Sequence, residues 1–465
     1  PNGKVDRKAL MEQKVELVRE KEFTAPRTAD EKILADIWCK VLGLKKVGIY
    51  DNFFELGGDS ILSIQMIAKA KMAGWKIAPA QFFLHQTISE LAKVIFLLDN
   101  ESYRKEEPVI GPTPLLPNQR FLLEQYTLEP QCMNTYMLLE VKQKLDISLW
   151  NIIFNQILLH HDALRSRFNQ DKMGWKQTIA PPDQQLPFLY FNFSETSKQE
   201  QITLMVHEAE RLQRSLNLSE GPIMQVAYFD MGSKRLDRLL IIIHHLVFDG
   251  VSWNILLEDI EIAIRQLQNG ERIKLPSKTS SIKQWGERLI EHYKSDVLNK
   301  EQMFWTNKKW EKSTPLPVDY PDGKKENTVG TEETTIISID AKKTNKLLEN
   351  CKLHNIKIIE VLLANLAITL SKWTRSSAVL INLMTHGRAQ LFDELDLTRT
   401  IGDFAFSYPI LIENNNTKSL HDEIIVIRNI IASIPNSGLG YTLSRYCEPN
   451  SALATRLKSF PQPEV

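Results

Sequence analysis

The sequence predicts a small all-α bundle of four helices followed by a larger α/β domain. Three observations support this fold class. Between Thr24 and Leu98, apolar residues recur at helical spacing behind residues that commonly cap helices. A charged and then proline-punctuated stretch, from Asp99 to Pro117, has the composition of an exposed linker. Beyond it, short apolar runs typical of strands alternate with helical patterns to the end of the chain.

Composition narrows the classes of partner. The chain has 465 residues, of which 43% are hydrophobic and 25% charged, so it can form two or three ordinary globular domains. Lys plus Arg and Asp plus Glu are balanced at 57 each. Because no net charge draws the whole chain to nucleic acid or to an anionic membrane, we expect neither as a partner. Proteins and tethered small molecules are the expected partners.

Cysteine spacing and the N-terminus indicate the compartment. The four cysteines are far apart and fit neither a disulfide framework nor a zinc spacing: Cys39, Cys132, Cys351 and Cys447. We therefore expect no bound metal and a reducing cytoplasm. The N-terminus has no apolar signal segment, and charged and polar residues interrupt the most apolar long stretch, 356–370. Without an initiator Met, the chain is expected to be an excised piece of a longer protein.

Helix start and stop signals define the predicted bundle. A capping-box pattern places Ser or Thr before a helix with Glu three residues later, and Gly commonly ends a helix. The signals are Thr28 with Glu31 and the stop Gly43, a start near Ser60 with the stop Gly74, and Thr87 with Glu90 before helical spacing that continues to Leu98.

The start of the second of these helices can hold an anion. Residues 51–61 read Asp-Asn-Phe-Phe-Glu-Leu-Gly-Gly-Asp-Ser-Ile. The two glycines allow a tight turn, and Ser60 then lies where free amides and the helix dipole favour negative charge. A phosphate ester on Ser60 would be well placed. Alternatively, Asp59 and Ser60 only cap the helix.

This segment strongly resembles the modification site of a peptidyl carrier protein. In that family the serine, here Ser60, receives 4′-phosphopantetheine from a phosphopantetheinyl transferase, and the thiol of this arm holds the amino acid as a thioester. The Asp-Ser-Ile at 59–61 is similar to carriers that feed epimerization domains. Residues 1–10 resemble the closing motif of an adenylation domain, in which Lys4 would contact the substrate. Without the rest of that domain, Lys4 is expected to be a solvated charge.

A pair of histidines follows a predicted buried strand. The apolar run 239–243 leads into His-His-Leu-Val-Phe-Asp-Gly-Val-Ser-Trp at 244–253. Side chains alternate between the two faces of a strand, so His244 and His245 should point in opposite directions. One is a candidate base, and the other is expected to be structural.

The decapeptide resembles the His-His-x-x-x-Asp-Gly signature of the condensation-domain superfamily of nonribosomal peptide synthetases. Its Val-Ser-Trp extension is similar to the epimerization branch. The resemblance implies a chloramphenicol-acetyltransferase-like domain, with two α/β lobes in a V around a tunnel that His245 faces, and places His244 in the core. It also implies that Asp249 holds the motif by an ion pair with an arginine upstream, for which Arg165 is the candidate. We expect this pair to be a structural bridge without a chemical role.

Inverting an α-carbon requires a base, a stabiliser of the developing oxyanion and a proton source on the opposite face. His245 suits the first role. Backbone amides after the strand, or the start of a helix near Ser252, suit the second. For the third, the family uses the glutamate of a Glu-Gly-His-Gly-Arg motif. Here 384–388 reads Met-Thr-His-Gly-Arg, and Met384 cannot transfer a proton. His386 matches an ordinary family position and is expected to be structural.

Three other residues are candidates near the tunnel. The family's Gly-Trp-Phe is replaced by Gly-Asp-Phe at 402–404, so Asp403 is either an acid with a raised pKa or a surface residue. The later motif Pro-Asn-Ser-Gly-Leu-Gly-Tyr at 435–441 is intact. It implies that Asn436 and Tyr441 line the tunnel. Tyr441 is a possible proton donor, or it only packs at a glycine turn.

These features predict four segments. Residues 1–22 are the C-terminal remnant of an adenylation domain with a linker, 23–98 the peptidyl carrier protein, 99–113 a linker, and 114–465 the epimerization domain. The chain stops just before the position of the family's Phe-Asn-Tyr-Leu-Gly element, so this last domain is expected to be C-terminally incomplete.

The implied function is L-to-D epimerization of an aminoacyl or peptidyl thioester on the Ser60 arm during nonribosomal peptide synthesis. Two alternatives stay open: peptide-bond formation by a condensation domain, for which the histidine motif alone suffices, and an impaired or non-catalytic domain that docks the carrier. The resemblance also implies an upstream adenylation domain and the condensation domain of the next module as partners.

We predict that a phosphopantetheinyl transferase with coenzyme A modifies Ser60 and no other serine, because only Ser60 begins a helix after a Gly-Gly turn in a carrier-like segment. Intact mass spectrometry should show the addition of one arm. The Ser60→Ala variant should stay unmodified, and labelling of that variant would contradict the assignment.

Overall fold

The computed structural model describes residues 23–77, 79–97, 107–172, 174–182, 188–325, 327–388, 391–392, 394–413 and 419–465. The chain divides into two compact units, Pro1–Lys105 and Glu106–Val465. The predicted adenylation remnant with Lys4, and the first half of the predicted linker, lie outside the described residues.

The first unit is a small helical bundle, as the sequence predicts. Its elements are α2 (Ala29–Leu42), α3 (Ser60–Met72), β1 (Trp75–Lys76), α4 (Pro79–Leu84), α5 (Ile88–Leu91) and β2 (Phe96–Leu97). The capping box of Thr28 and Glu31 is formed, and Gly43 ends α2 with a left-handed φ of 67°. Trp38 and Phe53 meet edge to face at 5.0 Å in the buried core.

The last predicted helix of this unit is shorter than expected. It ends at Leu91, and Phe96–Leu97 pairs antiparallel with Trp75–Lys76 instead of continuing the helix. Val94 and Ile95 nevertheless pack against the core. Helical spacing of apolar residues is therefore satisfied by a turn and a short strand, a pair that periodicity alone does not distinguish from a helix.

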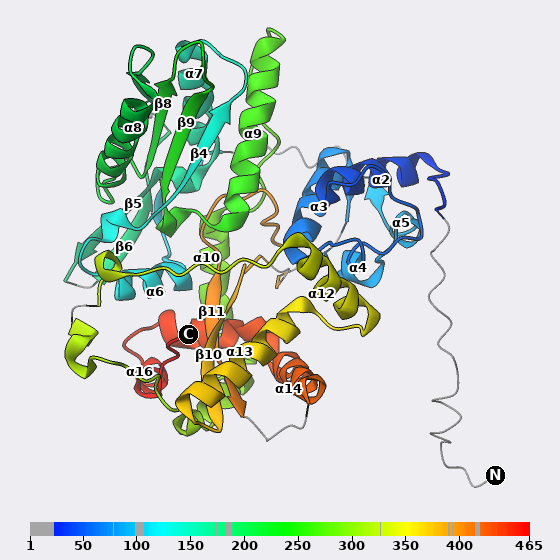
Figure 1. Cartoon of the computed structure of the whole chain (residues 1–465), viewed down its shortest axis with the longest axis vertical. Coiled ribbons are helices and arrows are strands. Elements are labelled where there is room, and N and C mark those ends of the chain that lie inside the picture. The colour runs from blue at the N-terminus through cyan, green and yellow to red at the C-terminus, as the bar shows by residue number, and fades with distance from the viewer. Residues whose placement is uncertain are drawn as a thin grey trace. The chain divides into compact units, whose positions relative to one another are not determined.

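A four-stranded sheet organises the first half of the second unit. Its order is β4 (Asn134–Val141), β9 (Asp237–His244), β8 (Met224–Asp230) and β7 (Phe188–Asn192). All neighbours are antiparallel except β7 and β8. α7 (Ile147–His160) and α9 (Gly250–Gln268) pack on one face, whereas α8 (Lys198–Gln213) covers the other (Figure 1).

A three-stranded sheet, β3 (Gly111–Thr113), β6 (Gly174–Ile179) and β5 (Ser166–Asp171), lies beside α6 (Pro117–Gln125) in the chain. β3 falls within the predicted linker 99–113, so the α/β domain begins earlier than expected. Pro112 does not prevent pairing because β3 is an edge strand, where a missing amide is tolerated.

The second half of this unit has its own core. The antiparallel pair β10 (Ala378–Thr385) and β11 (Phe406–Glu413) packs with helices into a second buried cluster. The helices of this half are α10 (Ile282–Tyr293), α11 (Val297–Thr306), α12 (Ala341–Leu353), α13 (Ile358–Thr374), α14 (Leu420–Ser433), α15 (Leu439–Tyr446) and α16 (Ala452–Ser459).

No single helix among the described residues has the length and apolar character needed to cross a membrane. One bent pair, α12 and α13 at 107°, passes that test by length and composition only.

Candidate functional site

Ser60 is the first residue of α3, and its side chain is exposed. The turn before it requires glycine. Gly57 has a φ of +99°, and a Cβ on Gly58 would lie 2.3 Å from the ring of Phe53. Asp59 caps the helix, because its Oδ1 accepts hydrogen bonds from the amides of Ile61 (2.9 Å) and Leu62 (2.8 Å).

Capping at this site is therefore the role of Asp59, and Ser60 keeps an accessible hydroxyl to which a phosphopantetheine arm can be attached. The expected anion site at the helix start is only partly free, since the Asp59 carboxylate already occupies two of the N-terminal amides.

The two histidines at the end of β9 point in different directions, as strand alternation predicts. His244 is buried; its Nε2 lies 2.7 Å from the carbonyl oxygen of Pro130, and its Nδ1 accepts a 3.2 Å hydrogen bond from the amide of Leu246. These two contacts define the tautomer, with the proton on Nε2. Burial lowers the pKa of His244 to about 4, so its imidazole is neutral at neutral pH.

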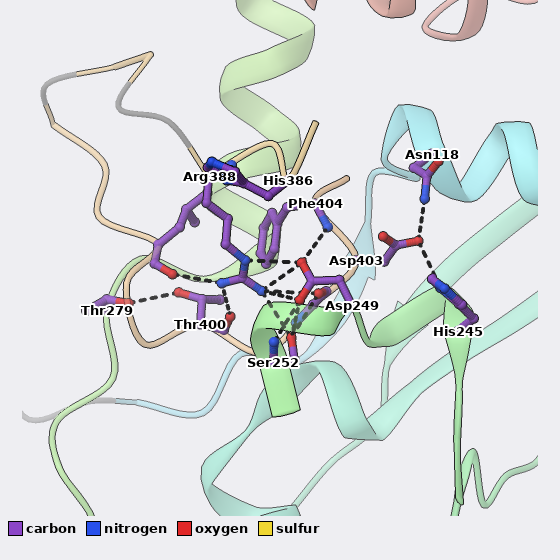
Figure 2. A network of polar contacts seen from close by, with 12 residues as sticks. Asn118, His245, Asp249, Ser252, Thr279, His386, Arg388, Thr400, Asp403 and Phe404 are labelled. Atoms are coloured by element: carbon purple, nitrogen blue, oxygen red, sulfur yellow. Dashed lines mark hydrogen bonds and ion pairs between the residues drawn. The ribbon is translucent and has the colours of Figure 1, made fainter. Parts of the chain in front are cut away.

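His245 begins the short turn after β9, and 42% of its side chain is exposed. Its Nδ1 faces Asp403 Oδ2 at 3.6 Å, and Asn118 Nδ2 donates a 2.6 Å hydrogen bond to the same carboxylate oxygen. Figure 2 shows Asp403 between these two residues. The contact with Asp403 raises the pKa of His245 above its ordinary value. Asn118 belongs to no sequence motif, so no sequence signal pointed to its part in this contact.

Asp403 is fully buried, so its interpretation as a surface residue is wrong. Burial raises the pKa of Asp403, as the sequence suggested for a residue in apolar surroundings, while its contacts with His245 and Asn118 oppose that increase. Its second oxygen, Oδ1, has no hydrogen-bond partner within the described part of the chain.

The predicted ion pair between Asp249 and Arg165 is not formed. Asp249 instead binds Arg388, whose Nη2 donates to Oδ1 at 2.9 Å and to Oδ2 at 3.0 Å, and whose Nε donates to Oδ2 at 3.1 Å (Figure 2). Both side chains are buried. The sequence predicted the right role for Asp249, a buried bridge, but the wrong partner.

Arg165 has a different structural role. Its guanidinium pairs with Asp162 at 2.7 Å, three residues earlier in the same turn. Its Nη1 donates to the carbonyl oxygens of Leu158 (2.8 Å) and Leu159 (2.9 Å), in the last turn of α7. Arg165 therefore satisfies carbonyls that a helix end leaves unpaired. With its donors used in this way, it is not available to Asp249.

The Asp249–Arg388 bridge extends into a larger polar network. Asp249 Oδ1 accepts from the amide and the hydroxyl of Ser252, both at 2.8 Å, and so caps α9. Arg388 Nη1 donates to the carbonyl of Thr400 at 2.7 Å. The amide of Ser252, a candidate oxyanion stabiliser in the sequence, is therefore engaged by Asp249. His386 accepts from the amide of Arg388 through Nδ1 at 3.0 Å, in keeping with the expected structural role.

The remaining candidates lie around β10, β11 and α15. Met384 stands opposite Ser407 in the β10–β11 register, and 64% of it is exposed. Tyr441 is buried with its ring 5.2 Å from that of Trp305, and burial raises its pKa to about 12. Asn436 binds the buried carboxylate of Glu301, a contact that the sequence did not suggest.

These placements limit what each candidate can do. Within the described residues, the polar contacts of His245 include Asp403 but neither Asn436 nor Tyr441. The high pKa of Tyr441 keeps its hydroxyl protonated near neutral pH. The roles of Asn436 and Tyr441 in a tunnel stay predictions.

One cluster has metal-ligand chemistry without a place for a metal. The donor atoms of His160, His161 and Asp259 lie within 4.8 Å of one another. However, Asp259 Oδ2 is 2.8 Å from His161 Nε2, and Arg399 binds Oδ1. Because the Arg399 guanidinium already supplies the positive charge that Asp259 needs, we assign the cluster to the buried polar network.

The two units thus have the form of a helical carrier bundle with an exposed helix-start serine, and of an α/β domain with a histidine at the end of a core strand. Residues 32–95 match the family described as Phosphopantetheine attachment site, and residues 109–453 match the family described as Condensation domain. The chain belongs to the condensation-domain family of nonribosomal peptide synthetases, with a carrier domain ahead of the condensation-type domain.

Curated relatives are multi-domain synthetases. The chain is 41% identical over 466 residues to a linear gramicidin synthase from Brevibacillus parabrevis, and the match covers 99% of the chain but 9% of that synthase. It is 34% identical over 470 residues to a chondramide synthase from Chondromyces crocatus, covering 100% of the chain and 12% of the synthase. The chain therefore spans about a tenth of the length of these relatives.

Solved structures give the same result for the second unit. The epimerization domain from the third module of tyrocidine synthetase B matches with a TM-score of 0.70 and 30% identity, over 78% of this chain and 82% of that one. The first condensation domain of the calcium-dependent antibiotic synthetase matches with a TM-score of 0.57 and 16% identity, over 76% of this chain and 79% of that one, which supports the fold alone. The predicted fold class and covalent 4′-phosphopantetheine are confirmed.

Because Arg388 neutralises a buried carboxylate, we predict that Arg388→Ala lowers the free energy of unfolding of the second unit by about 3–5 kcal/mol. Arg288→Ala is the matched control; Arg288 pairs with Glu394 at the surface, so its loss should cost about 1 kcal/mol or less. Denaturant titration measures both.

A double-mutant cycle separates the two possible partners of Asp249. Asp249→Asn should couple strongly to Arg388→Ala and not to Arg165→Ala. Coupling to Arg165 alone would contradict the bridge seen in the structure.

Proposed function

We propose that the chain interconverts the L and D configurations of an aminoacyl or peptidyl group on the Ser60 arm, with His245 as the proton-transfer residue. The observation that carries this proposal is the half-exposed imidazole of His245 beside the buried Asp403, at the end of a core strand. The 30% identity to an epimerization domain supports this activity over the others of the family.

The 4′-phosphopantetheine arm presents the acyl group as a thioester, which acidifies its α-proton. The chain's own part is to remove that proton and to return one. Neutral His245 has its Nε2 on the side of the ring away from Asp403, and it accepts the proton there. His244 cannot share this task, because its ring is buried and both of its nitrogens are engaged.

The residues support proton removal better than inversion. Net inversion needs a donor on the face opposite the base, and Met384 has no proton to give. Native epimerization is therefore slow in this proposal, and α-proton exchange with retention is faster. The exposed thioether at this position is also the observation that favours the second candidate, an impaired domain that mainly docks its carrier.

Peptide-bond formation uses the same histidine motif, but the Val-Ser-Trp extension at 251–253 and Asp-Ser-Ile at 59–61 favour epimerization. In either case the proposed partners are an upstream adenylation domain, a phosphopantetheinyl transferase and a downstream condensation domain.

His245→Ala should abolish loss of deuterium from an α-deuterated aminoacyl group loaded on Ser60, because no other group replaces the base. Mass spectrometry of the released amino acid measures this loss, using a panel of α-deuterated aminoacyl-coenzyme A thioesters for loading. His244→Ala is the control: it removes two buried hydrogen bonds and should lower the unfolding free energy by about 1–3 kcal/mol. Exchange that survives in folded His245→Ala would refute the assignment.

Met384→Glu should raise the rate of inversion at least tenfold, because it supplies a carboxyl group where the family has one. Chiral analysis of the amino acid released from Ser60 measures the rate. Met384→Gln, of similar size but without an acidic proton, is the matched control and should leave inversion slow. Equal rates in the native, Met384→Glu and Met384→Gln proteins would mean that the proton comes from another residue.

A further inference from the structure

Asn118, Asp403 and His245 form a continuous buried polar chain that ends at the candidate base. We propose that Asp403 is a positioning residue: it holds the proton of neutral His245 on Nδ1, orients Nε2 towards the substrate and stabilises the imidazolium, while Asn118 fixes the carboxylate. This inference rests on the proposed role of His245, and it replaces the sequence-based hypothesis that Asp403 is the opposing acid.

The three residues come from three separate elements. Asn118 lies in the first turn of α6, His245 follows β9, and Asp403 precedes β11. Asp403 Oδ2 receives Asn118 Nδ2 at 2.6 Å and faces His245 Nδ1 at 3.6 Å. Figure 2 shows the two dashed contacts meeting at this single oxygen. A carboxylate held in this way has one direction left in which to act, towards the imidazole.

Burial excludes the role of a direct acid. Asp403 is 0% exposed, whereas 42% of the His245 side chain is exposed. A proton on Asp403 therefore has no path to a bound substrate except through His245. Because the carboxylate and the imidazole act from the same side, Asp403 cannot deliver a proton to the opposite face.

The pair is also open in a way that favours proton uptake. Neither His245 Nδ1 nor Asp403 Oδ1 has a hydrogen-bond partner within the described residues. At 3.6 Å the pair is longer than a hydrogen bond, as is common for catalytic contacts before substrate binds. When Nε2 takes a proton, the ring becomes a cation, and a contact that shortens at that moment becomes a charge-assisted hydrogen bond. The contact is then stronger after proton transfer than before it.

Other charged groups near His245 do not supply this effect. Asp249 lies four residues further along the chain, but Arg388 neutralises it with three hydrogen bonds. His244 is neutral near pH 7, because burial lowers its pKa to about 4. Asp403 is therefore the group that controls the protonation of His245.

The direct test is a histidine titration by NMR on the holo protein with labelled imidazole nitrogens. The His245 signals are assigned by their loss in His245→Gln. In the native protein the nitrogen shifts of neutral His245 should report the Nδ1–H tautomer. The Nε2–H tautomer would overturn the proposal without any need for a variant to fold.

The same titration in Asp403→Asn should lower the pKa of His245 by about one unit, since the imidazolium loses its negative partner. The limb of the exchange rate that rises with pH should move down by the same amount, and the maximal rate should fall about tenfold. Asp237→Asn is the matched control: Asp237 is also a buried aspartate, but it lies at the opposite end of β9, so the pKa of His245 should not move. An unchanged pKa in folded Asp403→Asn would overturn the proposal.

These measurements separate the two hypotheses. If the tautomer and the pKa shift are as expected but no protein exchanges deuterium, the positioning role of Asp403 stands and the proposed epimerization fails. If His245→Ala abolishes exchange while Asp403→Asn moves neither the pKa nor the pH limb, the proposed function stands and the positioning role fails.

Discussion

The bridge between Asp249 and Arg388 is the interaction on which the candidate site depends. Asp249 caps α9, whose apolar face belongs to the first core, and Arg388 follows β10, which belongs to the second core. Three hydrogen bonds join them without exposure of the guanidinium. Since a buried charge that loses its partner is strongly destabilising, the two halves of the domain must keep this alignment.

The alignment extends to the base itself. The carbonyl of Gly402 accepts from the amide of Asp249 at 3.2 Å and from Arg388 Nη2 at 3.3 Å, so the loop that carries Asp403 is bound to the same bridge. His245 lies four residues before Asp249. One polar network therefore sets both the strand end that presents the imidazole and the loop that places a carboxylate behind it. The chemistry proposed for His245 depends on this shared support.

The features that could be predicted from sequence depend on neighbours in the chain. The capping box at Thr28, the glycine turn before Ser60 and the opposite directions of His244 and His245 each follow from local geometry. The features that could not be predicted depend on distant partners. Asp249 needed a buried cation, and nothing local distinguished Arg165 from Arg388. Likewise, β3 was predicted as linker because its partner β6 lies more than sixty residues away.

The exchange of tryptophan for aspartate at position 403 and the presence of Met384 can be understood together. Asp403 strengthens His245 as a proton acceptor from behind, whereas Met384 removes a donor from in front. Both changes favour a proton that leaves the α-carbon and returns to the same face. A buried carboxylate with an unpaired oxygen is also costly unless its contacts compensate. Its position against an open imidazole nitrogen is consistent with that cost being offset when the ring becomes charged.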